Sequence, residues 1–254
     1  MSICRSFIAR FIFLFIVYFL SEGNLLAQNK VALQFNALGG LAFTKFKNND
    51  LVPPRRRGGP TIGFESQFNL RAVLFSKNHN WKFSTGLGIS GRNFNMNRSN
   101  FSDLFIYIFS FDNPVKDSFK IVRLHLGGHY VDVPFAILFE PGKKKEKVVS
   151  FLAGVQLNAS FLTGKKSTIE FDETNQPLTP AQKQRARETY EATLNSFVLG
   201  IQPQVDIQFH ISDQWQMGFN LWLISFYFNS WDKSLIGTPV SISPALSVQY
   251  KIGL

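Results

Sequence analysis

Apolar and polar residues alternate along most of the chain after residue 30. Between Val31 and Thr44 the odd positions are mostly apolar, as at Leu33 and Phe35, whereas Gln34 lies between these two. Alternation with a period of two is typical of a β-strand that has one apolar and one polar face. The pattern predicts eight strands, over residues 31–44, 61–75, 81–94, 130–139, 148–162, 196–210, 214–228 and 240–254.

The lengths of the strands and of their connections indicate a membrane barrel. A tilted membrane strand needs about 9–11 residues, whereas strands of globular proteins usually have about 5–6. Long and short connections alternate, and outer-membrane barrels have short periplasmic turns and longer external loops. The connections are, in order, residues 45–60, 76–80, 95–121, 140–147, 163–195, 211–213 and 229–237. We therefore predict an all-β fold: an eight-stranded antiparallel up-and-down transmembrane β-barrel in a Gram-negative outer membrane, with its long loops extracellular.

The composition of the two faces predicts which of them points outward. The polar face consists mainly of Gly, Ser, Asn and Gln, whereas a water-facing exterior is rich in Lys and Glu. Aromatic residues near strand ends fit the girdles of membrane barrels. These are Trp81, Phe139, Phe161, Phe209, Trp215, Tyr227 and Tyr250. The apolar face should therefore contact lipid. The alternative is a soluble lipid-binding barrel, which would place Phe64, Phe151 and Ile207 inward.

A lipid-facing apolar surface directs the charged residues of the strands into the lumen. Because an eight-stranded barrel is filled by side chains, no water-wide pore is expected. The charged groups should form a paired and hydrogen-bonded network, since an unpaired buried charge is costly. A proton path or ligand site built from the same residues is the alternative. The predicted lumen residues are Glu65, Arg71, Lys82, Arg92, Asp132, Asp206 and Lys251.

The N-terminal residues have the pattern of a secretory signal. Arg5 and Arg10 precede an apolar stretch over 11–20, and Ala27 precedes Gln28 at a cleavage-like position. The predicted organisation is a cleaved signal peptide over 1–28 and a barrel domain over 29–254, with an uncleaved anchor helix as the alternative. The single cysteine, Cys4, would leave with the signal, which excludes disulfides and cysteine-bound metals.

The net charge of +10 is concentrated in predicted connections, at 55–57, 143–147 and 165–166. Basic patches bind nucleic acids in many proteins. After a signal peptide, however, anionic outer-membrane lipids and the phosphates of lipopolysaccharide are the better partners. Plain solvation of the basic loops is the alternative.

Two loop segments have patterns of their own. Residues 101–111 are apolar on both faces, which predicts a strand hairpin with 119–126 that extends above the membrane. The alternative is a docking surface for a partner. That surface would comprise Phe105, Ile106, Tyr107, Ile108 and Phe109. Further along, Thr179 to Gln182 form a capping box with Pro180 at the first helical position, so a short helix should run to Tyr190.

Candidate chemistry is sparse, and no cofactor, metal or catalytic site is expected. His125 and His129 would share one side of a helix, but on a strand they lie roughly 13 Å apart. His210 and Ser212 match the His-x-Ser pattern of barrel lipid A deacylases. Those enzymes act at the outer leaflet, whereas this pair falls at a predicted periplasmic turn. An enzyme that modifies lipid or lipopolysaccharide is therefore the alternative to a non-enzymatic barrel.

Several segments resemble a known family. Residues 130–135 (YVDVPF), 151–155 (FLAGV) and the ending at 247–254 are similar to the small Bacteroidota outer-membrane β-barrels described as PorT-like. The resemblance implies an integral barrel that acts through extracellular loops, with envelope or secretion proteins as partners. Some members are accessory factors of type IX protein secretion. Asp132 replaces the usual Glu of the strand motif, and Leu254 replaces the usual terminal aromatic residue.

Overall fold

The structure is a computed structural model, and only part of the chain can be described. The described residues are 31–45, 60–76, 80–97, 104–107, 118–141, 148–171, 178–192, 194–228 and 239–252. The predicted signal peptide over 1–28 lies outside them, as do Ile108 and Phe109 of the predicted partner surface.

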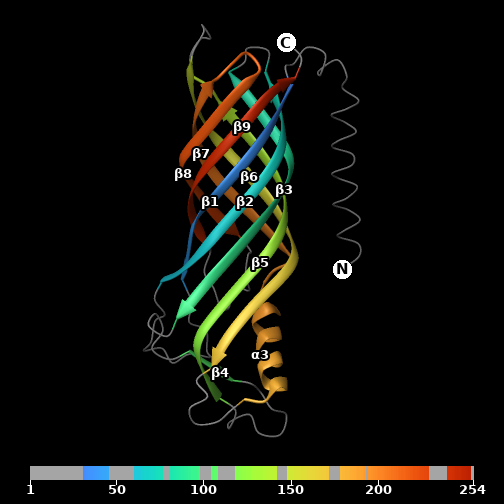
Figure 1. Ribbon diagram of the computed structural model, residues 1–254, viewed down its shortest axis with the longest axis vertical. Helices are drawn as coiled ribbons and strands as arrows, with labels where there is room; N and C mark the ends of the chain where they lie inside the picture. The colour runs from blue at the N-terminus through green and yellow to red at the C-terminus, as the bar shows by residue number, and fades with distance from the viewer. Residues whose placement is uncertain are drawn as a thin grey trace.

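Nine strands and one helix lie within the described residues (Figure 1). Their bounds are β1 Val31–Lys45, β2 Pro60–Phe75, β3 Trp81–Asn97, β4 Leu104–Tyr107, β5 Ser118–Phe139, β6 Val149–Phe171, α3 Pro180–Ala192, β7 Phe197–His210, β8 Trp215–Phe228 and β9 Val240–Ile252. Eight long strands pair antiparallel in a ring, which closes because β1 pairs with β9 and β3 with β5. The predicted eight-stranded up-and-down barrel is confirmed; β4 is an addition outside the ring and pairs with β5.

The two ends of the barrel differ, as the alternation of connection lengths predicts. The ends of β2, β5 and β7 lie at one end of the barrel, together with the start of β1 and the end of β9 (Figure 1). We call this the turn end. The opposite end, which we call the loop end, carries β4 and α3.

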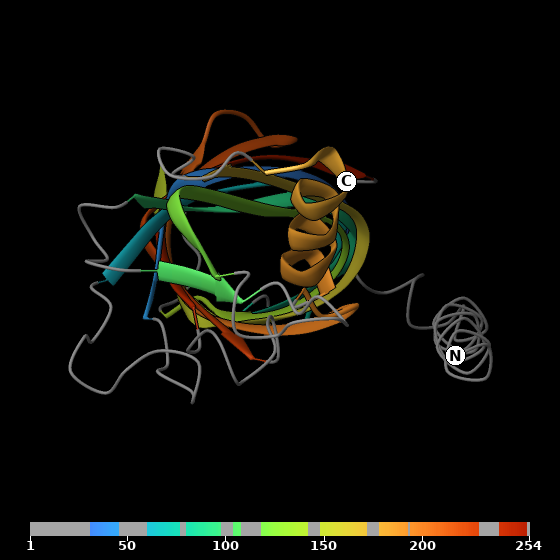
Figure 2. The same ribbon diagram turned by 90° about the horizontal axis from the view of Figure 1, so that it is seen from below.

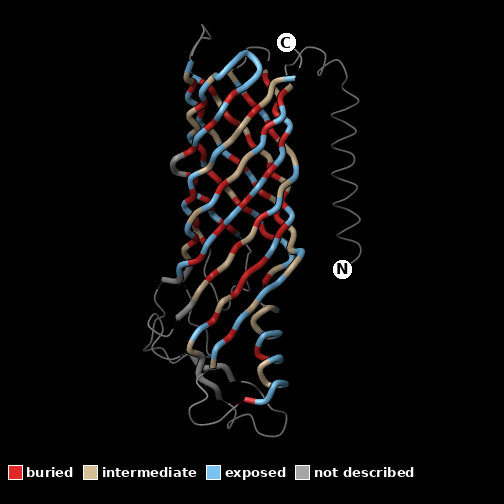
Figure 3. The backbone as a smooth tube through the Cα atoms, in the orientation of Figure 1, coloured by how far each residue is buried: buried red, intermediate tan, exposed pale blue. Residues whose placement is uncertain are grey.

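The apolar face of the strands points outward. Leu33 and Phe35 are 44% and 50% exposed, whereas Gln34 between them is 5% exposed. The same alternation of buried and exposed residues runs around the whole ring (Figure 3). Phe64 and Phe151 are each 58% exposed, so the alternative of a soluble barrel with an apolar lumen is wrong. Apolar exposure this extensive is not found on monomers in water. We call this surface the apolar belt.

Aromatic pairs stand at the borders of the apolar belt. At the turn end the ring centroids of Trp81 and Phe139 lie 4.9 Å apart, and those of Trp215 and Tyr250 lie 4.8 Å apart. Toward the loop end Phe161 lies 5.3 Å from Phe197. Aromatic rings at this level are typical of the interface between hydrocarbon and headgroups.

Tyr227 does not belong to these girdles, and its predicted place there is wrong. The register between β8 and β9 shifts between Asn220 and Leu223, so that β8 has one extra residue. A bulge of one residue exchanges the inward and outward faces of the strand beyond it. Trp215 before the bulge is exposed, whereas Tyr227 beyond it is 1% exposed and points into the lumen.

Strands β5 and β6 are much longer than predicted, with 22 and 23 residues. Residues 121–129 of β5 pair with 164–171 of β6, so the expectation of a loop over the whole of 163–195 is wrong. Beyond the apolar belt no lipid requires an apolar face. The alternation of apolar and polar residues therefore ends there, although the backbone pairing of the two strands continues. We call residues 121–129 and 163–171 the β5–β6 extension.

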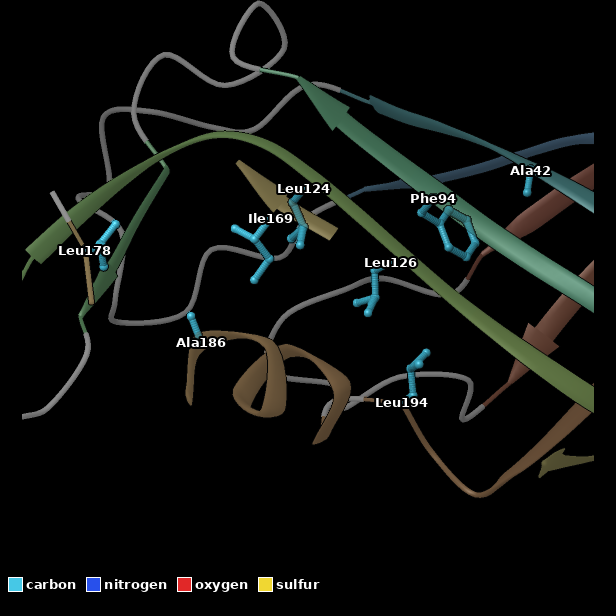
Figure 4. Packing of buried hydrophobic residues seen from close by; sticks show 8 residues of the cluster. All are labelled: Ala42, Phe94, Leu124, Leu126, Ile169, Leu178, Ala186 and Leu194. Atoms are coloured by element: carbon cyan, nitrogen blue, oxygen red, sulfur yellow. The ribbon is translucent and has the colours of Figure 1, made fainter. Parts of the chain in front are cut away.

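The predicted helix is confirmed as α3. The Thr179 N–H donates to Gln182 Oε1 at 2.9 Å, and the Gln182 N–H donates to Thr179 Oγ1 at 3.3 Å, which is a capping box. The helix packs through Ala186 on an apolar cluster under the β5–β6 extension (Figure 4). This loop-end cluster comprises Ala42, Phe94, Leu124, Leu126, Ile169, Leu178, Ala186 and Leu194. Seen along the barrel axis, α3 lies within the outline of the ring (Figure 2).

The predicted hairpin above the membrane is also present in the described residues. Leu104–Tyr107 of β4 pairs antiparallel with 118–121 of β5. Phe105, Ile106 and Tyr107 of the predicted partner surface therefore lie on a short strand at the loop end.

Candidate functional site

The seven charged residues that the sequence predicts for the lumen differ in burial. The side chains of Glu65, Arg71, Lys82, Arg92 and Asp132 are all buried. Asp206 and Lys251 are partly exposed. Six of the seven fall into three groups along the barrel axis. Lys251 lies near the end of β9, and its backbone N–H donates to the Gln214 carbonyl at 2.9 Å.

The first group surrounds Arg92 in the half of the lumen nearer the loop end. Arg92 Nε lies 3.4 Å from Glu65 Oε1, and Arg92 Nη2 lies 3.6 Å from Asp132 Oδ1. The guanidinium carbon lies 4.6 Å from the ring centroid of Tyr130 and 4.0 Å from that of Tyr227. Cation–π contacts of this kind are strongest where the charge is desolvated. We call these five residues the Arg92 cluster.

Further hydrogen bonds hold the Arg92 cluster in place. The Tyr227 hydroxyl donates to Glu65 Oε1. Gln67 Nε2 donates to Asp132 Oδ2 at 3.1 Å, and Arg92 Nη2 donates to Ser160 Oγ at 2.9 Å. The cluster thereby connects five strands, β2, β3, β5, β6 and β8, across the lumen. A cavity of about 10 Å³ remains beside Glu65 and Arg92, which is at most the space of one water.

The second group lies in the middle of the barrel around Arg71 and Asp206. Both line a cavity of about 20 Å³ together with Asn36 and Asn220. Asn220 Nδ2 donates to Asp206 Oδ1 at 2.7 Å. In the amide orientation that satisfies both groups, Asn36 Oδ1 accepts from Arg71 Nη1 at 3.1 Å and from Nη2 at 3.2 Å. The cavity is too small for an organic ligand, since water alone needs about 10–15 Å³.

The third group closes the lumen near the turn end. Lys82 Nζ lies 3.3 Å from Glu140 Oε2 and donates to Gln208 Oε1 at 2.7 Å. Ser150 Oγ donates to Glu140 Oε1 at 2.7 Å. Alternation does not predict Glu140 here, because this residue follows the last residue of β5 and lies in the predicted connection 140–147.

Ser150 and His210 approach each other, but their arrangement is not that of a nucleophile and its base. In a Ser-His-Asp triad the acid holds the histidine, which takes the serine proton. Here the acid, Glu140, accepts from Ser150 itself. Gln216 Nε2 lies 2.5 Å from His210 Nδ1, and the tautomer that accepts this amide N–H carries its proton on Nε2, 2.9 Å from Ser150 Oγ. In that tautomer the histidine donates to the serine and is not its base.

The His-x-Ser pattern of the sequence has a structural explanation. Ser212 Oγ accepts from the Trp215 N–H at 3.1 Å and so stabilises the turn between β7 and β8. Within the described ranges no group of three or more His, Cys, Asp or Glu side chains is placed to hold a metal ion. None of the helical residues described forms a helix long and apolar enough to cross a membrane.

Sequence reasoning missed Tyr130, Tyr227 and Glu140 as lumen residues. Tyr227 was hidden by the β8 bulge, and Glu140 by its position at a strand end. Tyr130 begins the YVDVPF segment, which was the available signal: it alternates with Asp132 on one face of β5. Hydrogen-bonded pairs within the Arg92 cluster are separated in the sequence by 27 positions, for Arg92 and Glu65, up to 162 positions, for Glu65 and Tyr227. Sequence spacing could therefore not reveal these contacts.

The chain is similar in structure to Neisserial surface protein A, at 10% identity over 87% of this chain and 97% of that one, with a TM-score of 0.39. It is also similar to OprG from Pseudomonas aeruginosa (10% identity, 89% and 99% coverage, TM-score 0.37). A third is Ail of Yersinia pestis in complex with the heparin analogue sucrose octasulfate (11% identity, 87% and 99% coverage, TM-score 0.27).

No curated protein matches the chain. The model of the family described as "Outer membrane protein beta-barrel domain" matches residues 26–229, which is most of the chain. Together with the closed ring and the apolar belt, this match shows that the chain belongs to the outer membrane protein β-barrel domain family and is a barrel of the cell outer membrane.

Proposed function

We propose that this protein is a non-enzymatic outer-membrane barrel whose loop end, placed outside the cell, is a binding platform for other envelope proteins. The observation that carries the proposal is the β5–β6 extension with α3 packed on it. This folded unit lies beyond the apolar belt, where membrane anchoring does not require it.

The filled lumen supports a binding role rather than a transport role. The Arg92 cluster, the group around Arg71 and the group around Lys82 follow one another along the axis, and the loop-end cluster lies beyond them. The cavities of about 10 and 20 Å³ between these groups do not form a water-wide channel. Eight-stranded barrels are generally filled in this way.

The platform has its own core and its own polar contacts. Leu124 and Leu126 are completely or almost completely buried beneath α3, and burial of a leucine contributes roughly 1.5–3 kcal/mol. Lys165 Nζ donates to the Glu191 carbonyl at 2.7 Å, and Ser167 Oγ donates to Glu191 Oε1 at 2.6 Å. Burial also raises the pKa of the Tyr190 hydroxyl. The helix therefore presents a fixed outer surface and not a mobile one.

The finer role that we propose is that of an accessory in type IX protein secretion or in envelope assembly. It is supported by the resemblance of the YVDVPF segment at 130–135 to PorT-like barrels. Modification of lipids or lipopolysaccharide is the alternative, and the proton arrangement at Ser150 and His210 does not favour it.

Site-specific photo-crosslinking in the native host tests this proposal. A photoreactive residue at Arg187, which is exposed on α3, should crosslink to a component of the secretion or assembly machinery. The same residue at Asp213, exposed in the turn between β7 and β8, is the matched control and should not. In parallel, deletion of residues 178–192 should reduce secretion while the barrel still assembles. Normal secretion, or identical crosslinks from both positions, would contradict the proposal.

A further inference from the structure

The outward face of the β5–β6 extension carries polar residues directly above the apolar belt. Ile89 of β3 and Val131 of β5 are paired and are the last apolar residues on the outward faces of these two strands. The next outward row consists of Gly91, His129 and Gly164 on three neighbouring strands. This row therefore lies where hydrocarbon gives way to headgroups.

Two additional rows, which lie further from the apolar belt, complete this surface. Gly127 pairs with Asn93 on one side and with Lys166 on the other. His125 pairs with Asn95, whose Oδ1 accepts from its Nδ1, and with Thr168. We call the outward surface of His125, His129, Lys166, Asn93 and Asn95 the polar shelf.

Lys165 and Lys166 lie on opposite faces of β6, and a bulge determines which face each of them occupies. The pairing of β5 with β6 shifts between His129 and Tyr130, and Thr163 is the extra residue. Beyond it, Lys165 points toward α3 and donates to the Glu191 carbonyl. Lys166 lies on the outward face, and no acidic partner for it is found in the part of the chain that the structure describes. It acts electrostatically on His125, whose pKa is lowered by partial burial and by this ammonium group.

The polar shelf is shallow at its centre. His129 is exposed, and its two neighbours in the row are glycines, so neither adjacent position of the row carries a side chain beside the ring. The Asn93 side chain lies across Gly127, where a Cβ atom would meet Asn93 Oδ1. A ligand that approaches along the membrane surface thus meets ring nitrogens, an amide and an ammonium group.

The charge of this surface is positive. Of the acidic residues described, Glu170 is the one that shares this face, and its Oε1 lies 3.1 Å from Nη1 of Arg123. Lys166 and the two histidines then remain to interact with an anion. A lysine near an anionic membrane surface contributes about a fivefold change in binding.

We propose that the polar shelf binds a phosphate group of the phosphorylated glycolipid headgroup in the outer leaflet. The acyl chains of that lipid would lie along Ile89 and Val131, and its phosphate would contact Lys166 and His129. The proposal rests on the same outward placement of the loop end as the proposed function, but it concerns a different face and needs no protein partner.

Binding of lipid A to the protein purified from outer membranes in detergent tests the proposal. Bis-phosphorylated lipid A should bind at least fivefold more tightly than its dephosphorylated form, and excess inorganic phosphate should compete poorly because it lacks the acyl chains. Lys166→Gln and His129→Gln should each weaken binding of the phosphorylated lipid about fivefold. Lys165→Gln is the matched control and should stay within twofold of wild type.

Three results would overturn the proposal: equal binding of the two lipids, equal losses from Lys165→Gln and Lys166→Gln, or no loss from either Lys166→Gln or His129→Gln. Circular dichroism of each variant confirms that the barrel is intact, and His129→Gln supplies an independent reading if Lys166→Gln does not fold. Because this assay contains no other protein, its failure is distinguishable from the failure of the crosslinking experiment.

Discussion

The guanidinium group of Arg92 and the phenol of Tyr227 share one carboxylate. The Arg92 carbon lies 4.0 Å from the Tyr227 ring centroid, while both side chains contact Glu65 Oε1. Asp132 contacts the same guanidinium from β5. One guanidinium group therefore contacts two buried carboxyl groups and two tyrosine rings.

Removal of this cation should be strongly destabilising. Arg92→Met removes the guanidinium group that contacts the buried carboxyl groups of Glu65 and Asp132, and breaking a buried ion pair in this way costs about 3–5 kcal/mol. The free energy of unfolding in urea, measured with the barrel in lipid vesicles, should fall by that amount. Arg123→Met is the control, because the Arg123 and Glu170 side chains are 57% and 50% exposed and such pairs contribute about 0–1 kcal/mol. Similar losses from both variants would show that the Arg92 cluster is not a buried ion network.

A charged substitution should be destabilising within the apolar belt but tolerated at an equally exposed residue outside it. Leu87 on β3 is 63% exposed and Ile211 in the turn after β7 is 64% exposed. Leu87→Arg should cost about 2–4 kcal/mol because the charge faces lipid, whereas Ile211→Arg should cost about 0–1 kcal/mol. The fraction of protein that folds into vesicles, resolved by heat-dependent gel migration, measures the difference. Equal folding of the two variants would contradict the lipid-facing assignment.

The packing of α3 should depend on Ala186 and not on Ala181. Ala186 is buried in the loop-end cluster, whereas Ala181 is exposed at the start of the helix. Ala186→Arg places a long charged side chain in an apolar site and should detach α3 from the β5–β6 extension. Proteolytic cleavage within 178–192 should then become at least tenfold faster, with the barrel still intact. Ala181→Arg should be cleaved at the wild-type rate; faster cleavage of both variants would argue against this packing.

His125 should titrate below its ordinary pKa of 6.5, because partial burial and the Lys166 ammonium disfavour its charged form. The unfolded chain then binds more protons than the folded one between the lowered pKa and 6.5. The free energy of unfolding should therefore rise with pH across that window. In His125→Gln this contribution to the pH dependence should be absent. An NMR titration of the imidazole measures the pKa directly. Lys166→Gln should move it upward, whereas Lys165→Gln, on the opposite face, should not; a pKa at or above 6.5 would refute the assignment.

The barrel itself was predictable because lipid and lumen select opposite residue types. Wherever a strand crosses the apolar belt, alternation such as that of Leu33, Gln34 and Phe35 identifies both the strand and its faces. Beyond the belt this selection ends, so residues 163–171 have no periodic signal although they continue β6. At the β8 bulge one extra residue exchanged the faces, and a periodic interpretation placed Tyr227 on the wrong side.

The candidate site was predictable as a set of residues but not as contacts. Inward-facing positions follow from alternation, and these include Glu65, Arg92 and Asp132. Which of them meet depends on the register between strands, which single residues at bulges determine. Glu140 shows a second limit, because a residue just past a strand end has no assigned face in a periodic pattern.

The pairing of β1 with β9 determines when this protein can mature. These are the first and last strands of the ring, so closure waits until the ribosome has made the C-terminal part of the barrel. Until then the nascent sheet has two open edges and an apolar outer face, both of which promote aggregation. Because open sheet edges are excluded from the hydrocarbon region, insertion and ring closure should occur as linked events.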